Sequence, residues 1–172
     1  MKNVLWMLSA LPLLLGVPAP AAMAESLVTF NGGIGVNPVS NVANNQTVGD
    51  ATRNDVRGVP PGGQPWVISK LKARVKEDGA IKVQGEGLLL AGGNGIGTNG
   101  GASVFASLFC GPAASATEHS SDREIGVPLE ANGDFRIEDV LSPTPPVPCE
   151  SPVLLIRNLA GRWFAAGIPG QD

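Results

Sequence analysis

The stretch WVISKLKARVKEDGAIKVQGEGLLL, residues 66–90, is the strongest indication of fold in this chain. From Lys70 onward apolar and charged residues alternate, which is typical of a strand with one buried face and one solvated face. Glu77-Asp78-Gly79 supplies a tight turn, because its glycine can adopt a positive φ. The alternation resumes at Ala80 and continues to Gly87. The segment therefore predicts a β-hairpin.

The solvated face of this hairpin carries a basic stripe. It consists of Lys70, Lys72, Arg74, Lys76 and Lys82. Such a stripe suits contact with an anionic surface. It is also typical of an ordinary solvated sheet face, or of a charged edge that deters aggregation. The sequence leaves these interpretations open.

Other short segments with strand-like patterns follow, separated by turns rich in Gly, Pro and Asn. We expect strands at 26–30, 102–110, 123–129, 135–141, 152–157 and 162–168, and a second strand or extended ledge at 32–39. Alternation predicts inward positions for Val104, Ala106, Leu108, Cys110, Ile125, Val127 and Leu129. The turn Asn132-Gly133-Asp134 is expected to close a second hairpin, and 111–122 is expected to be a polar loop with a solvated His119.

The fold class follows from this pattern of short strands. No convincing amphipathic helix follows residue 24, so we expect an all-β domain. An antiparallel β-sandwich is favoured, with a small β-barrel as the alternative. The pattern resembles immunoglobulin-like and transthyretin-like sandwiches in architecture, which implies no function. Residues 66–172 are expected to form the sandwich body, and 25–65, part strand and part loop, to belong to the same domain.

Residues 1–24 have the organisation of a secretory signal peptide. Lys2 precedes an apolar stretch, and Ala22-Met23-Ala24 is a small-x-small cleavage signature. We therefore expect cleavage before Glu25 and an exported protein, periplasmic or extracellular. No later apolar run is long enough to span a membrane, so no transmembrane segment is expected in the mature chain.

The chain contains only two cysteines, Cys110 and Cys149. In an exported protein we expect them to form a disulfide, worth about 3–4 kcal/mol in the chain-entropy model. Two cysteines and the single His119 are too few for a four-ligand zinc site. No metal or cofactor is predicted.

Two features suggest a contact with a ligand or partner. Gly95-Ile96-Gly97-Thr98-Asn99-Gly100 matches G-x-G-x-x-G, but a strand rather than the required helix is expected to follow it. A flexible loop, or a contact loop with Asn94, Gly95, Gly97 and Asn99 as candidate residues, fits better. Trp66 and Trp163 are the other candidates. Trp163 and Phe164 are adjacent and so face opposite sides of a strand, which leaves one of the two rings free to contact carbohydrate or protein. The alternative is that both tryptophans pack in the core.

The charges and acidic groups narrow the function classes. The net charge of −3 gives no basic excess, so no nucleic-acid partner is expected. The acidic groups 77–78, 118–124 and 138–139 fall at turns or on solvated faces, and no G-x-S-x-G motif accompanies His119. We expect a non-enzymatic binding or interaction module for an extracytoplasmic ligand or protein. A hydrolase that uses paired carboxylates, and a structural subunit that assembles through a sheet edge, are the alternatives.

Overall fold

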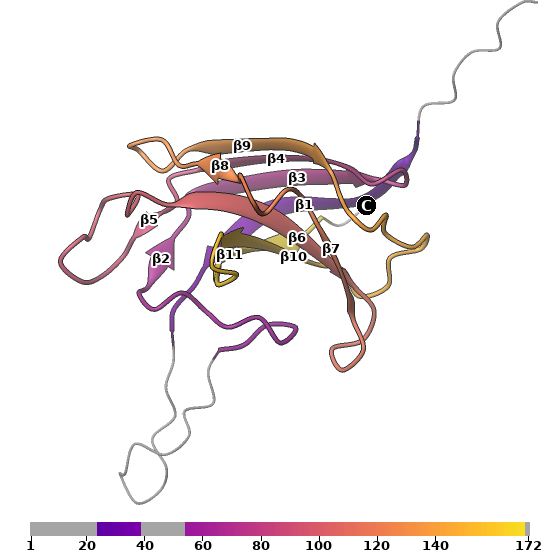
Figure 1. The fold of residues 1–172 in the computed structure, drawn as a ribbon, viewed down its shortest axis with the longest axis horizontal. Coiled ribbons are helices and arrows are strands. Elements are labelled where there is room, and N and C mark those ends of the chain that lie inside the picture. The colour runs from indigo at the N-terminus through magenta and orange to yellow at the C-terminus, as the bar shows by residue number, and fades with distance from the viewer. Residues whose placement is uncertain (1–23, 39–53, 171–172) are drawn as a thin grey trace, which may run out of the picture.

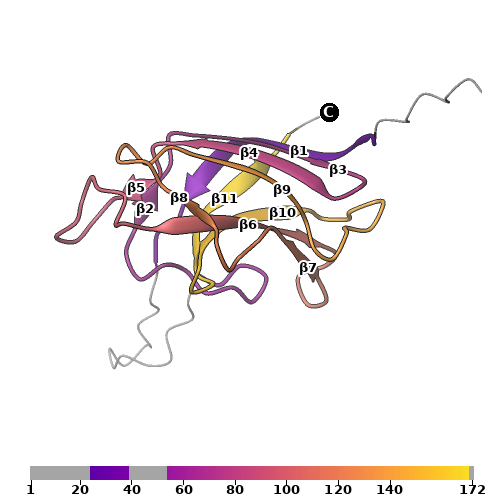
Figure 2. The same cartoon turned by 45° about the horizontal axis from the view of Figure 1, so that its top comes forward.

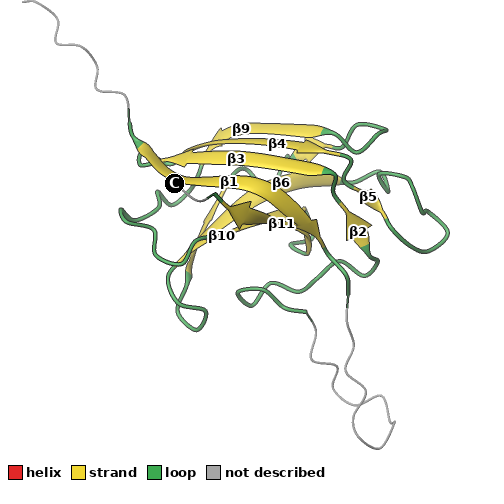
Figure 3. Cartoon of the chain, turned by 180° about the vertical axis from the view of Figure 1, so that it is seen from behind, coloured by secondary structure: helices red, strands yellow, loops and turns green. Residues whose placement is uncertain are grey.

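The computed structural model describes residues 24–38 and 54–170, and every regular element in these residues is a strand. The strands are β1 (Ser26–Gly35), β2 (Trp66–Val67), β3 (Lys70–Lys76), β4 (Ala80–Glu86), β5 (Leu89–Leu90), β6 (Ser103–Cys110), β7 (Thr117–Ser120), β8 (Val127–Pro128), β9 (Phe135–Val140), β10 (Val153–Asn158) and β11 (Trp163–Pro169). Figure 3 shows strands and loops, with no helix in the described part of the chain. The all-β prediction is confirmed.

One antiparallel sheet dominates the structure. Its order is β7-β6-β10-β11-β1-β3-β4-β9, with β8 paired to β6, and β2 and β5 form a separate two-stranded sheet. The large sheet folds over itself, so that β3, β4 and β9 lie above β6 and β10 (Figures 1 and 2). A backbone bridge between Ser120 and Ser142 draws its two ends together. The fold is a nearly closed, barrel-like sheet around one core, within the predicted range of sandwich and small barrel.

The predicted hairpin is present as β3 and β4. Leu71, Val75 and Ile81 point inward and are at most 1% exposed, while the intervening charged residues face outward. Gly79 has a φ of 86° in the turn between them. The return strand is shorter than predicted, because Gly87 has a φ of 68° and redirects the chain toward β5.

β1 is a single strand where two separate segments were expected. Its first half pairs with β3 and its second half with β11, and the register shifts between Phe30 and Gly33. Gly32 has a φ of 111° at this irregularity, a conformation that glycine adopts readily. β1 therefore connects the two halves of the folded sheet.

The prediction of a loop over 111–122 is wrong at residues 117–120. These residues form β7, which pairs with β6, and His119 is only 4% exposed. Its Nδ1 lies 2.7 Å from the Pro143 carbonyl oxygen, and its Nε2 lies 2.9 Å from Thr117 Oγ1. This edge strand is stabilised by polar partners distant in the sequence, such as the Pro143 carbonyl, and not by alternating apolar residues. Its sequence therefore resembles that of a loop.

The second predicted hairpin is also wrong. The turn at Asn132-Gly133-Asp134 is present, but β8 pairs with β6 and β9 pairs with β4. Ile125 was expected to point inward and is 76% exposed. The chain crosses here from one half of the folded sheet to the other, which the local turn sequence does not reveal.

Candidate functional site

The predicted disulfide between Cys110 and Cys149 is present. It joins the end of β6 to the proline-rich segment 143–152, and the amide of Gly111 donates to the Glu150 carbonyl beside it (2.6 Å). A disulfide is compatible with an oxidising, exported compartment. The structure does not test the predicted cleavage: Ala22 lies outside the described residues, and Ala24 and Glu25 lead directly into β1.

The glycine-rich candidate loop joins β5 to β6. Asn99 fixes its base, because the side-chain amide donates to the carbonyls of Leu129 (2.9 Å) and Glu130 (3.0 Å). Asn94, Gly95 and Gly97 lie in the turns that precede it. The element that follows is strand β6, so the loop lacks the helix N-terminus that holds a pyrophosphate in nucleotide-binding folds. A ligand contact at this loop stays a prediction.

The two candidate tryptophans belong to the core. Trp66 is 6% exposed and stacks on Phe164, with ring centroids 4.0 Å apart. Trp163 is 4% exposed, and its indole nitrogen donates to the Asn54 carbonyl (3.0 Å). Of the two interpretations offered by the sequence, packing of both tryptophans in the core is therefore confirmed, and neither Trp163 nor Phe164 is exposed. The segment around Pro60 pairs with Trp163 and covers this end of β11.

A partly buried polar cluster, which the sequence did not predict, ties β7, β6 and β10 together. The Glu118 Oε1 atom accepts from Arg157 (2.5 Å), Ser120 (2.8 Å) and Ser107 (3.2 Å). The Arg157 guanidinium also lies 5.1 Å above the Phe105 ring, and burial lowers the pKa of Arg157 despite the opposing charge of Glu118.

This cluster is not a Ser–His–acid triad. Along β7, Glu118 and Ser120 point to one side of the sheet and His119 to the other, because neighbouring residues of a strand alternate. The histidine therefore cannot take a proton from either serine of the cluster. The arrangement explains the burial of Arg157 and is structural.

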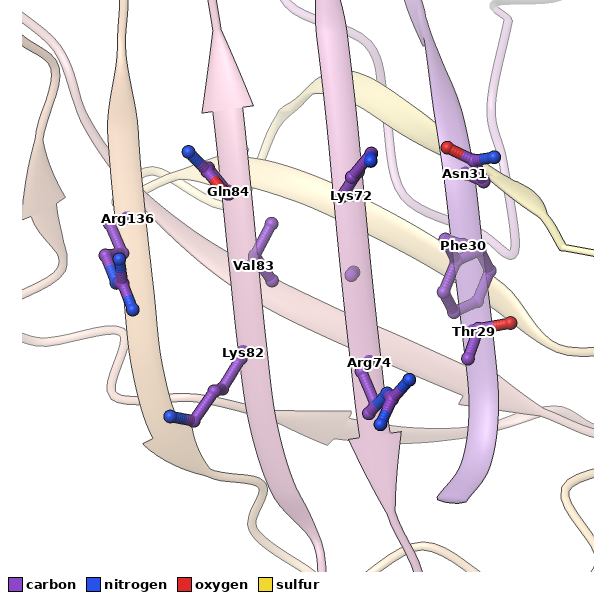
Figure 4. A pocket seen from close by; sticks show the side chains of 10 residues that line it. Thr29, Phe30, Asn31, Lys72, Arg74, Lys82, Val83, Gln84 and Arg136 are labelled. Carbon is purple, nitrogen blue, oxygen red and sulfur yellow. The ribbon is translucent and has the colours of Figure 1, made fainter.

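The strongest candidate site is an open groove on the outer side of β1, β3, β4 and β9, with a volume of about 370 Å³. Figure 4 shows its side chains in two rows across the strands. One row contains Asn31, Lys72, Gln84 and Arg136, and the other contains Thr29, Arg74 and Lys82. The second row continues on β9 to Glu138, which lies opposite Lys82 beside the groove. We call this surface the cationic face; it carries four cationic side chains and one carboxylate.

Glu138 is the acidic group of the cationic face. Its carboxylate bonds to Arg136 Nε (2.6 Å) and lies 3.5 Å from Lys82 Nζ. The hydrogen bond from Arg136, followed by the charges of Arg136 and Lys82, lowers the pKa of Glu138. Within the described residues, Lys72 and Arg74 form no ion pair. Two of the four cations are thus uncompensated.

The sequence predicted only part of this face. Lys72, Arg74 and Lys82 belong to the basic stripe, whereas Lys70 forms its own ion pair with Glu86 (2.7 Å). Arg136 was missed because β9 is distant in the sequence and was assigned to a different hairpin. The alternation of Arg136 with Phe135 and Ile137 indicated that Arg136 is solvated, but not which residues of other strands lie beside it.

Two further hollows offer less chemistry. One, of about 460 Å³, is lined by 35–37, 65–68 and Ala91 and has no charged side chain. The other, of about 260 Å³, lies between Val104 and Asp139, where Asp139 accepts from the backbone of Asp122 (2.8 Å). Among residues 24–38 and 54–170, no group of three or more His, Cys, Asp or Glu side chains is arranged to hold a metal ion.

Comparison of the chain with family models, curated proteins and solved structures found no match. No helix in the described residues is long and apolar enough to cross a membrane.

Proposed function

We propose that this protein is an exported, non-enzymatic binding module that holds an anionic ligand on its cationic face. The net charge of the chain is −3, yet this face gathers four cations against one carboxylate. The surface is open and lies on regular strands, so its side chains are presented by a stable framework. An anion is the ligand chemistry that complements it.

The observation that carries the proposal is the register of β3 and β4. Arg74 lies directly opposite Lys82, with Lys72 two residues away on the same face. Like charges in directly opposite positions destabilise a sheet, and an acidic residue at either position would remove the repulsion. Local unfavourable features of this kind are typical of functional sites. An anion bound between the strands would convert the repulsion into attraction.

The acidic residues support a role without catalysis. Asp78 accepts from the backbone of Ala80 (3.0 Å), and Asp122 accepts from the backbone of Glu124 (2.8 Å). Asp139 accepts from the backbone of Asp122, and Glu118 is engaged by Arg157. Most of the carboxylates considered for a hydrolase therefore stabilise turns or ion pairs. Glu138, the carboxylate of the cationic face, has its pKa lowered by Arg136 and Lys82, which does not suit a general acid.

Binding of inorganic polyphosphate tests the proposal, because this probe supplies negative charge without sugar, base or lipid. We expect binding to the purified protein by isothermal titration, weakening as salt is added. Lys72→Gln together with Arg74→Gln should lower the affinity about tenfold, since an exposed ion pair is worth up to about 1 kcal/mol, two are lost, and about 1.4 kcal/mol corresponds to a factor of ten.

The matched control is Arg123→Gln together with Arg162→Gln, which changes the net charge equally at exposed positions away from the groove. The control should bind like the wild type. Equal losses in both double variants, or no binding at all, would refute an anion site on this face. Polyphosphate recovered from the complex should keep its length, and shortened chains would identify an enzyme instead.

A further inference from the structure

We infer that the ligand of the cationic face is an extended acidic polysaccharide that lies across the strands. This inference rests on the proposed function and specifies its ligand. The row of Asn31, Lys72, Gln84 and Arg136 follows from the register of four neighbouring strands. It alternates amide, cation, amide and cation along a line about 14 Å long, three strand spacings of about 4.8 Å.

The cations of this row suit carboxylate or sulfate groups. Lys72 and Arg136 are separated by one intervening strand, which places them about 10 Å apart. A ligand with a single acidic group cannot reach both. An extended chain with repeated acidic groups reaches both, and the second contact then forms within the complex, so that affinity rises steeply with chain length.

The amides between the cations distinguish a sugar chain from other polyanions. Asn31 and Gln84 are exposed, and neither side chain makes a hydrogen bond within the described residues. An amide both donates and accepts, which suits the hydroxyl groups of a sugar. Polyphosphate has no hydroxyl groups along its chain, so it can accept from the amide nitrogens but offers no donor to the amide oxygens.

Other polyanions fit the face less well. Among the described residues that line the groove, the only aromatic side chain is Phe30, which is 2% exposed, so they offer no stacking platform to a single-stranded nucleic acid. The outward side chains of the two rows are polar or charged, so the face offers no apolar group for insertion between lipids.

Glu138 regulates how strongly the row binds. It engages Arg136 and Lys82, and a ligand carboxylate competes with it for these two cations. Glu138→Gln keeps the shape of the side chain and removes its charge. We expect the substitution to raise the affinity for an acidic chain several-fold.

The test is titration with oligogalacturonates of increasing length, with inorganic polyphosphate in parallel. We expect the affinity for oligogalacturonate to rise at least about tenfold once the chain is long enough to reach both Lys72 and Arg136. Asn31→Ala together with Gln84→Ala should weaken oligogalacturonate binding about fivefold, because two neutral hydrogen bonds are lost, and should weaken polyphosphate binding less, because polyphosphate uses only the donor side of each amide.

The outcomes separate this inference from the proposed function. If polyphosphate binds at Lys72 and Arg74 while oligogalacturonate binds no better at any length, the anion site stands and the polysaccharide is wrong. Equal effects of the amide substitutions on both probes would likewise overturn the sugar assignment. Tighter binding of an oligothymidylate, or of vesicles with anionic lipids, would replace it. Circular dichroism of each variant confirms that the exposed substitutions leave the fold intact.

Discussion

Gly85→Ala should destabilise this protein far more than an ordinary glycine-to-alanine change in a strand. Gly85 lies opposite Phe135, and a Cβ atom at Gly85 would lie 2.0, 2.3 and 2.8 Å from three atoms of the Phe135 ring. Normal carbon–carbon contacts are about 3.5–4.0 Å, so the ring has to move by more than about 1 Å. The close contact fixes the register of β4 and β9, and this register also places Arg136 opposite Gln84.

The magnitude follows from the burial of the ring. Phe135 is 4% exposed, and complete burial of such a side chain is worth about 1.5–3 kcal/mol. Overpacking of a filled core costs about 1–3 kcal/mol. The ring is displaced only in part and the core is strained only in part, so neither cost applies in full. We therefore expect the free energy of unfolding to fall by about 2–4 kcal/mol. This is a large fraction of the roughly 5–15 kcal/mol by which typical domains are stable.

Urea unfolding of the oxidised protein, followed by fluorescence of the buried Trp66 and Trp163, measures the effect. Phe135→Ala alone should cost about 3–5 kcal/mol through the cavity that it leaves. In the double variant the added methyl group has room, so the combined loss should be about 2–3 kcal/mol smaller than the sum. Additive losses would refute the clash as the cause. Gly63→Ala is the control, because no atom lies within 4 Å of the position that its added methyl group would occupy.

Three further predictions concern the disulfide, the polar cluster and the acidic group of the cationic face. Replacing Cys110 and Cys149 by alanine should lower the free energy of unfolding by about 4 kcal/mol, because the disulfide closes a loop with a sequence separation of 39. Thiol labelling of the unfolded wild type should find no free cysteine, and two reactive thiols would contradict the pairing. Glu118→Ala should cost about 1–3 kcal/mol, because Arg157 loses the anion that compensates its burial, and adding Arg157→Met should recover part of this loss in urea unfolding. Folding lowers the pKa of Glu138, so this carboxylate stabilises the fold at pH values above its ordinary pKa of 4.5, and the stabilisation is lost as the pH falls through the lowered pKa. A stability advantage of the wild type over Glu138→Gln that persisted in stronger acid would contradict this sign.

The fold class and the central hairpin could be obtained from the order of the amino acids. Strict alternation from Lys70 to Glu86, around a turn with Gly79, specifies one buried and one solvated face whatever the rest of the chain does. It also placed Lys72, Arg74 and Lys82 on the solvated face, and the two cysteines admitted only one intramolecular pairing. The hairpin depends only on neighbouring residues, and two cysteines allow only one intramolecular disulfide. Neither prediction therefore requires knowledge of the three-dimensional arrangement.

The pairing of the strands could not be obtained from the sequence and depends on the three-dimensional fold. β9 joins β4 rather than β8, and this pairing brings Arg136 into line with Gln84 and Lys72. Pairing with β6 likewise makes a strand of the polar residues around His119. Alternation fixes which side of a strand a residue occupies, but every solvated strand face looks alike in sequence. The cationic face exists because strands distant in the sequence share hydrogen bonds in one particular order.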